Sequence, residues 1–285
     1  MTPRDRVIEA NRLRHHLLEW GEAGPVVLLT HGFLEHGHAW DLVAPLLAAA
    51  GHHVFALDWR GHGDSEWIGR GGYYHFADYT ADLASLVRAL GGRAALVGHS
   101  MGANAVLVYA GTEPERVRAL VCVDALGPPD SSPAVAPDRF RTWLADLERV
   151  AGREPKRLSR AEAEQRLRER FPHFSDAVCR HMAEHGTRPD GDLRAWKFDP
   201  LHQTTSPQPY YRAQAQAFWR RIACPVLYVD GGQSPIRHDE AEVATRLADL
   251  RAQRITLAGS NHHPHLEEPE VLARVLVAFL AAAPA

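Results

Sequence analysis

Ala94-Ala95-Leu96-Val97-Gly98-His99-Ser100-Met101-Gly102 is the stretch of sequence that decides the fold. Its first four residues form an apolar run typical of a buried strand, and the pattern over residues 101–111 predicts a helix. A G-x-S-x-G pattern between a strand and a helix holds the serine in a sharp, strained turn that lifts its Oγ above the sheet. We therefore predict that Ser100 is a nucleophile, rather than a serine that only caps the helix.

The rest of the chain alternates short apolar runs with longer helical patterns. This alternation predicts an α/β fold with a mostly parallel, doubly wound sheet. The predicted strands are residues 26–29, 54–57, 94–97, 119–123, 226–229 and 255–257, and the predicted helices are residues 40–49, 79–90, 101–111, 239–248 and 269–283. The first 20 residues predict an antiparallel hairpin at the sheet edge.

Residues 128–218 interrupt the alternation, because they contain no strand-like run. They begin with Pro128, Pro129 and Pro133 and continue with charged helical patterns over 142–151 and 159–170. A structureless loop of this length is uncommon in a compact domain. We expect a helical cap inserted into a core made of residues 1–127 and 219–285.

Composition narrows the class of protein. The chain has 285 residues and a formal net charge of −3, so it lacks the basic surface that nucleic acids or anionic membranes attract. Its three cysteines are widely spaced, which favours a reduced, cytoplasmic setting without disulfides. The expected partner is a small-molecule substrate, with no nucleic acid and no membrane; a homodimer is compatible with the sequence.

Two further segments could supply the oxyanion hole and the general base that a serine nucleophile needs. His31-Gly32-Phe33 follows the first predicted parallel strand, where the N–H of Phe33 can pair with that of Met101 as an oxyanion hole. Asn261-His262-His263-Pro264-His265 follows the last predicted strand, where the general base is needed for the order serine, acid, histidine. From the residues alone His262, His263 and His265 compete for this role.

These motifs together resemble the α/β-hydrolase superfamily. Leu57-Asp58-Trp59-Arg60-Gly61-His62-Gly63-Asp64-Ser65 matches the family's D-x-R-G-x-G-x-S turn, in which we expect the charged residues to be structural. The family's closing motif, G-H-x-x-x-x-E-x-P, implies His262 as the base, with Asn261 replacing the glycine. The resemblance also implies that residues 128–218 are the helical cap. Trp196-Lys197-Phe198-Asp199-Pro200 and residues 214–225 are similar to the serine hydrolase-like (Kraken-type) group.

The catalytic acid departs from the family pattern. The usual position after the strand at 226–229 holds Ser234, which cannot stabilise an imidazolium. Asp230 lies four residues too early, and Asp239 and Glu240 are expected to begin a helix. Asp124 ends the strand at 119–123, where some members of the superfamily place their acid, and we predict Asp124, with Asp230 as the main competitor.

The resulting expectation is a serine hydrolase of a small to medium, apolar carboxylic ester, acting without cofactor or metal. Substrate contacts are expected from His31, Gly32, His99 and Trp196. The resemblance implies that dehalogenases and epoxide hydrolases need a carboxylate where this chain has Ser100, whereas lactone, thioester and carbon–carbon bond hydrolysis stay open.

Two alternative functions belong to other classes of protein. One is a non-catalytic ligand-binding protein on the same fold, suggested by the missing late acid. The other is a metallohydrolase, suggested by His36-Gly37-His38-Ala39-Trp40-Asp41. The aspartate comes one residue later than the metallo-β-lactamase pattern H-x-H-x-D-H requires, so we interpret these histidines as exposed loop residues.

Overall fold

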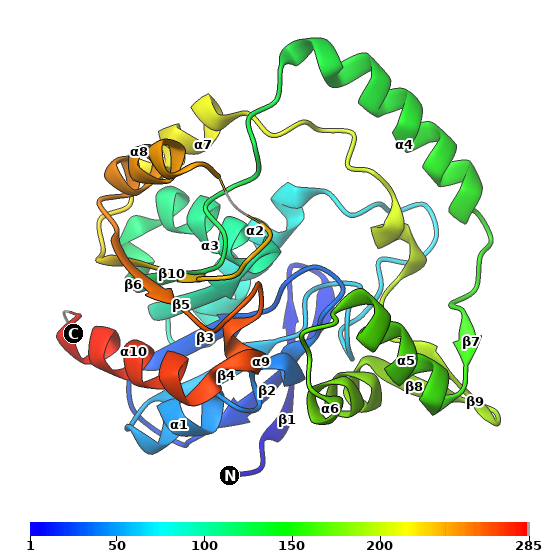
Figure 1. Cartoon of the computed structure of the whole chain (residues 1–285), viewed down its shortest axis with the longest axis horizontal. Helices are drawn as coiled ribbons and strands as arrows, with labels where there is room; N and C mark the ends of the chain where they lie inside the picture. Colours follow the sequence, from blue (N-terminus) through cyan, green and yellow to red (C-terminus); the bar gives the residue numbers. More distant parts are fainter. Residues whose placement is uncertain (237, 284–285) are drawn as a thin grey trace.

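The computed structural model describes residues 1–236 and 238–283, and its centre is an eight-stranded sheet (Figure 1). The strand order is β1-β2-β4-β3-β5-β6-β10-β11. The strands are β1 (Arg4–Ala10), β2 (Leu13–Trp20), β3 (Val26–Thr30), β4 (His53–Leu57), β5 (Ala94–His99), β6 (Val117–Val123), β10 (Val226–Gly231) and β11 (Gln253–Leu257). The strands from β4 to β11 pair in parallel, whereas β1 and β2 form an antiparallel hairpin on the edge, which confirms both predictions.

Helices cover both faces of this sheet, as a doubly wound fold requires. One face carries α1 (Ala44–Ala49) and α10 (Pro269–Ala282), whose apolar residues pack on Val27, Val97 and Val121. The opposite face carries α2 (Phe76–Ala89), α3 (Met101–Thr112), α7 (Arg212–Trp219) and α8 (Glu240–Leu250). No helix in the described part of the chain is long and apolar enough to cross a bilayer.

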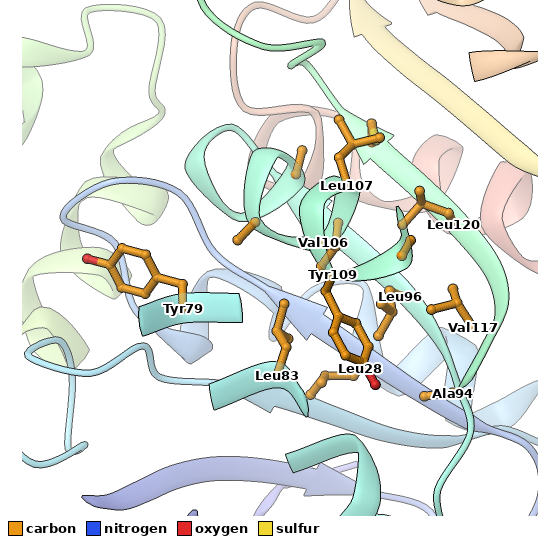
Figure 2. Close-up of a cluster of buried hydrophobic side chains, with 14 of the residues drawn as sticks. Leu28, Tyr79, Leu83, Ala94, Leu96, Val106, Leu107, Tyr109, Val117 and Leu120 are labelled. Carbon is orange, nitrogen blue, oxygen red and sulfur yellow. The ribbon is translucent and has the colours of Figure 1, made fainter. Parts of the chain in front are cut away.

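The central strands are apolar on both faces because each face is buried under a helical layer. Alternate residues of a strand therefore belong to two separate clusters: Leu96 packs with α2 and α3, and Val97 packs with α1 and α10. Figure 2 shows part of the first cluster, with Leu28, Leu96 and Leu120 from strands and Leu83, Val106 and Tyr109 from helices. This packing holds the carboxyl end of β5 rigidly, and Ser100 follows directly.

The predicted helix at residues 40–49 divides into two parts. A short 3-10 helix, η1, spans Gly37–Trp40, and α1 begins only at Ala44. Pro45 lies in the first turn of α1, where a missing backbone N–H costs no hydrogen bond. The other predicted core helices agree with the structure to within about three residues, as is usual for helix ends.

Residues 128–218 contribute no strand to the large sheet, but they are not purely helical. They contain η3 (Pro133–Val135), α4 (Ala136–Val150), α5 (Arg160–Arg170), α6 (Asp176–Gly186), η4 (Pro200–Gln203) and α7. Three short strands, β7 (Arg157–Leu158), β8 (Thr187–Asp190) and β9 (Leu193–Trp196), form a separate antiparallel sheet. The expectation of a wholly helical segment is wrong on this point, because strands of two to four residues show no readable alternation.

A buried carboxylate orders the turn after β4. Asp58 accepts hydrogen bonds from the backbone N–H of Gly37 at 2.6 Å and of Asp64 at 2.9 Å, and from His16 Nδ1 at 2.7 Å. Through these hydrogen bonds Asp58 links the β1–β2 hairpin to the segment that follows β3. Arg60 pairs with the buried Asp82 at 2.6 Å. These side chains have the structural roles expected from the sequence.

This arrangement predicts a pH-dependent stability. Burial disfavours the protonated His16 ring, but hydrogen bonds to Asp58 and Asp5 outweigh it and raise the pKa of His16 from 6.5 to about 9. A raised histidine pKa stabilises the fold fully below the unfolded pKa and loses its effect as pH rises through the folded pKa. Urea unfolding should therefore show His16→Gln destabilised most near pH 6, with the deficit shrinking between about pH 6.5 and about 9. Substitution of the exposed His75 by Gln is the control. If His16→Gln lost the same free energy of unfolding near pH 6 as near pH 9, this explanation would be contradicted.

Candidate active site

Ser100 occupies a strained turn between β5 and α3. Its backbone has φ 50° and ψ −114°, a left-handed region that non-glycine residues rarely enter. The turn needs close backbone approach, because a Cβ on Gly98 would lie 2.5 Å from the Ala103 nitrogen and one on Gly102 would lie 2.7 Å from the His31 oxygen. Strain of this kind is held by the surrounding fold and is typical of functional sites.

Three side chains predicted from the sequence meet at the carboxyl edge of the sheet. His262 Nε2 lies 3.1 Å from Ser100 Oγ, and His262 Nδ1 lies 2.6 Å from Asp124 Oδ2. Asp124 directly follows β6, which is hydrogen-bonded to β5 on one side and to β10 on the other. A serine hydroxyl, an imidazole and a buried carboxylate in this order can move a proton from the serine to the imidazole and stabilise the resulting cation.

Asp124 is held in position by two further donors. The N–H of Gly231 donates to Oδ1 at 2.9 Å, and the hydroxyl of Ser234 donates to Oδ2 at 2.6 Å. Ser234, the residue at the family's usual acid position, therefore contacts the carboxylate on the neighbouring strand. Sequence reasoning treated Ser234 only as a missing acid, and its supporting hydrogen bond could be found only from the contact between the two strand ends.

The competing acids have other partners. Asp230 accepts from Arg254 at 2.7 Å and from Thr256 at 2.8 Å. Asp239 accepts from the backbone N–H of Glu242 at the start of α8, and Glu240 pairs with Arg254 at 2.7 Å. Among these carboxylates Asp124 is the one hydrogen-bonded to His262.

The loop that carries His262 is fixed by the glutamate of the closing motif. Glu267 accepts from the backbone N–H of Asn261 at 2.5 Å and of His263 at 3.0 Å. Both N–H groups flank His262, so Glu267 sets the position of its backbone. His263 and His265, the other candidate bases, are buried, and both rings face Glu35 instead of Ser100.

A buried ion pair lies behind the nucleophile, and sequence reasoning missed it. His99 Nδ1 lies 3.0 Å from Glu35 Oε1, and His99 Nε2 lies 2.8 Å from the His262 carbonyl oxygen. Both ring nitrogens face acceptors, and only a protonated imidazole donates from both. Although burial opposes it, the charge of Glu35 raises the pKa of His99, and His99 with the two other rings lowers the pKa of Glu35 well below its usual range. Burial lowers the pKa of His263 to about 3 and of His265 to about 4, so these two rings stay neutral.

The loop after β3 lies against the turn that carries Ser100, because a Cβ on Gly102 would meet Thr30 and His31. Met101 opens α3, and the side chain of Phe33 is 43% exposed above the loop. The prediction that His31, Gly32 and His99 line the substrate pocket is wrong, because all three are buried and none of them lines the cavity beside the site. His31 Nε2 instead accepts from the N–H of Trp59, and the buried Gly32 donates its N–H to Glu35 at 3.0 Å.

A cavity of about 430 Å³ adjoins this site. Trp196, as predicted, is among its lining residues, with Phe33, Phe171, Phe174, Met182, Phe198, Leu266 and His263, and with Arg166 and Arg170 among the charged ones. Ser100 is not part of the lining, and Phe33, Glu35 and His263 are the lining residues next to the catalytic residues. The walls come mainly from residues 166–203, which therefore face the carboxyl edge of the sheet.

Comparison with known proteins agrees with this fold. A family model described as the alpha/beta hydrolase fold matches residues 25–269. A 2-(acetamidomethylene)succinate hydrolase of Mesorhizobium japonicum is 27% identical over 281 residues, or 97% of this chain and 95% of the relative. A serine hydrolase-like protein of Danio rerio is 26% identical, over 92% of this chain and 83% of the relative.

Two other matches differ in extent. Epoxide hydrolase A of Mycobacterium tuberculosis is 42% identical over 114 residues, which cover 38% of this chain and about a third (35%) of the relative. The solved thioesterase domain from the curacin biosynthetic pathway superposes with a TM-score of 0.87 at 27% identity, covering 98% of this chain and 100% of the domain.

The buried ion pair generates a stability prediction. Glu35→Gln removes the carboxylate that compensates the His99 cation, and breaking a buried pair in this way should cost roughly 3–5 kcal/mol in free energy of unfolding. Glu22→Gln is the matched control, because the Glu22 side chain is 83% exposed and pairs only on the surface with Arg4. Urea denaturation at neutral pH measures both variants, and similar small losses for the two would contradict the assignment.

Proposed function

The chain belongs to the alpha/beta hydrolase fold family, and on this premise we propose that it is a serine hydrolase that cleaves a carboxylic ester through an acyl-enzyme on Ser100. The observation that carries the proposal is the single imidazole of His262, hydrogen-bonded to Ser100 Oγ at 3.1 Å and to Asp124 Oδ2 at 2.6 Å. An unactivated serine is a weak nucleophile, and an adjacent oriented base is what makes it reactive.

The reaction follows from this geometry. Ser100 Oγ attacks the ester carbonyl while His262 Nε2 takes its proton, and Asp124 stabilises the imidazolium and fixes its tautomer. The N–H groups of Phe33 and Met101 stabilise the negative oxygen of the tetrahedral intermediate. His262 then gives its proton to the leaving alcohol, which departs as the acyl group stays on Ser100. Water activated by the same imidazole releases the acid and restores the serine.

The nucleophile and the cavity narrow the substrate class. A serine at the elbow favours acyl transfer over the opening of an epoxide or the displacement of a halide, for which the family resemblance implies a carboxylate. The aromatic and aliphatic side chains around the cavity favour a small to medium apolar acyl group. We further propose that residues 128–218, apart from α7 on the face of the main sheet, form the cap that sets substrate size, because residues 166–203 supply most of the cavity wall.

A thioester is the second substrate class worth testing. The structural match to a thioesterase domain covers nearly the whole chain, and the same acyl-enzyme chemistry cleaves both bonds. A panel of oxygen esters and thioesters of increasing acyl length distinguishes them. A non-catalytic ligand-binding protein would hydrolyse none of these substrates.

The first test removes the nucleophile. Ser100→Ala should lower kcat by roughly 10⁴- to 10⁶-fold, leaving only binding and oxyanion stabilisation. The same substitution should abolish labelling by a fluorophosphonate probe, which reacts fast only with an activated serine. Ser132→Ala, in the loop before η3, is the control and should keep both the turnover and the labelling of the wild type. Near-normal turnover of Ser100→Ala would overturn the proposal.

The second test separates the two acids. Asp124→Asn removes the charge that stabilises the imidazolium and should lower kcat by about 10⁴-fold with the fold intact. Asp230→Asn only weakens the pairing with Arg254 and should leave kcat near the wild-type value. Circular dichroism checks folding in both variants. The reverse ranking would assign the acid to β10.

A further inference from the structure

A second group of histidines lies outside the catalytic site, where α6 packs against η1. His38 and Asp41 come from η1 and the turn that follows it, and His181 and His185 come from α6. We call these four residues the seam cluster, because they lie where the segment after β3 contacts α6 of residues 128–218. The interpretation of His36 and His38 as exposed loop residues is wrong, because His36 is buried and the side chain of His38 in η1 is only 16% exposed.

The side chains of the seam cluster already converge. His38 Nδ1 lies 2.9 Å from Asp41 Oδ2, and His181 Nε2 lies 3.5 Å from the same oxygen. The rings of His38 and His185 stack at 3.7 Å between centroids. One ligand atom from each of His38, Asp41 and His185 lies within 4.8 Å of the others. His181 and His185 are four residues apart, so they project from the same face of α6.

One carboxylate oxygen of the seam cluster is available for a ligand. Within residues 1–236 and 238–283, Asp41 Oδ1 is buried without a hydrogen-bond partner. An unpaired buried acceptor of this kind is costly unless a donor, a water molecule or a cation satisfies it.

We propose that the seam cluster binds a divalent transition-metal ion and that this ion joins α6 to the core. His38, Asp41 and His185 supply two imidazoles and one carboxylate, and with a water molecule they suit zinc, which takes four ligands at about 2.0–2.2 Å in a tetrahedron. His181 is not a ligand, because its Nε2 hydrogen-bonds to the His38 carbonyl oxygen at 2.9 Å. Such bonds set the ligand atoms roughly 3.3 Å apart, so modest side-chain rotations from the present positions complete the site. The cluster is partly exposed, which gives the ion access from solvent.

Metal binding at the seam cluster would affect the cavity wall through Met182. Met182 follows His181 on α6 and lines the cavity, and its carbonyl oxygen accepts from His36 Nε2 at 3.2 Å. An ion held by both α6 and η1 would therefore fix this cavity wall relative to the loop that carries Phe33. The proposal does not depend on Ser100 or on the substrate class.

The chain offers other clusters that must be distinguished from the seam cluster. His99, His262 and His263 form one, and His173, His263 and Glu267 form another. Both share residues with the active-site loop, and both ring nitrogens of His99 already hydrogen-bond to Glu35 and to the His262 carbonyl. Metal binding at either cluster is a rival outcome of the experiment.

The experiment is calorimetric titration of the full chain with Zn²⁺ in a non-chelating buffer, paired with Co²⁺ titration followed by visible absorption. The proposal predicts one site with tetrahedral-type Co²⁺ bands. His185→Ala and Asp41→Asn should each weaken Zn²⁺ binding by about 10-fold or more. His173→Ala and His262→Ala, which remove ligands of the two rival clusters, should bind Zn²⁺ as the wild type does. The metal-free melting temperature of each variant checks its fold.

Hydrogen exchange supplies a readout independent of affinity. Zn²⁺ should slow exchange of the α6 amides in the wild type and in Asp190→Asn, a surface variant away from the seam cluster, but not in His185→Ala. Absence of stoichiometric Zn²⁺ binding would overturn the proposal. So would loss of binding in His173→Ala or His262→Ala with retention in His185→Ala.

Discussion

The imidazole of His262 is the point on which the rest of the active site depends. One of its nitrogens reaches Ser100 Oγ and the other reaches Asp124 Oδ2, and the three side chains come from separate strand ends. Because β5 and β6 are neighbours in the sheet, Ser100 and Asp124 are positioned by strand pairing. His262 comes from a loop after β11, so the remaining task of the fold is to hold that loop.

Buried charge accomplishes this task. Glu267 accepts hydrogen bonds from the backbone N–H groups on both sides of His262. His99 donates to the His262 carbonyl oxygen, and the carboxylate of Glu35 balances the charge of the His99 ring. The histidine backbone is thus held from two directions by charge-assisted hydrogen bonds, which are stronger than neutral ones. The strained backbone of Ser100 is instead held by apolar packing, because α1 and α10 pack against one face of the sheet and α2 and α3 against the other.

Much of this arrangement could be predicted from the sequence because it depends on local patterns. The strands of the core are apolar runs that end in glycine or polar residues, and the motifs around Ser100 and His262 lie at strand ends. Asp124 is predicted from the position at which some superfamily members place their acid, and the pairing of β5 with β6 puts that strand end beside Ser100. The cluster around Glu35 could not be predicted, since it joins residues 64 and more than 200 positions apart in the chain, and no local pattern encodes such contacts. The short strands β7, β8 and β9 were missed because they are stabilised by pairing with one another.

The hydrogen bond between His262 and Asp124 can be observed directly by proton NMR. A proton held between imidazole Nδ1 and a buried carboxylate exchanges slowly and resonates far downfield of ordinary amides. The account predicts one such resonance that is lost in His262→Gln and in Asp124→Asn and is kept in Asp230→Asn. A downfield resonance that survives Asp124→Asn and disappears in Asp230→Asn would contradict it.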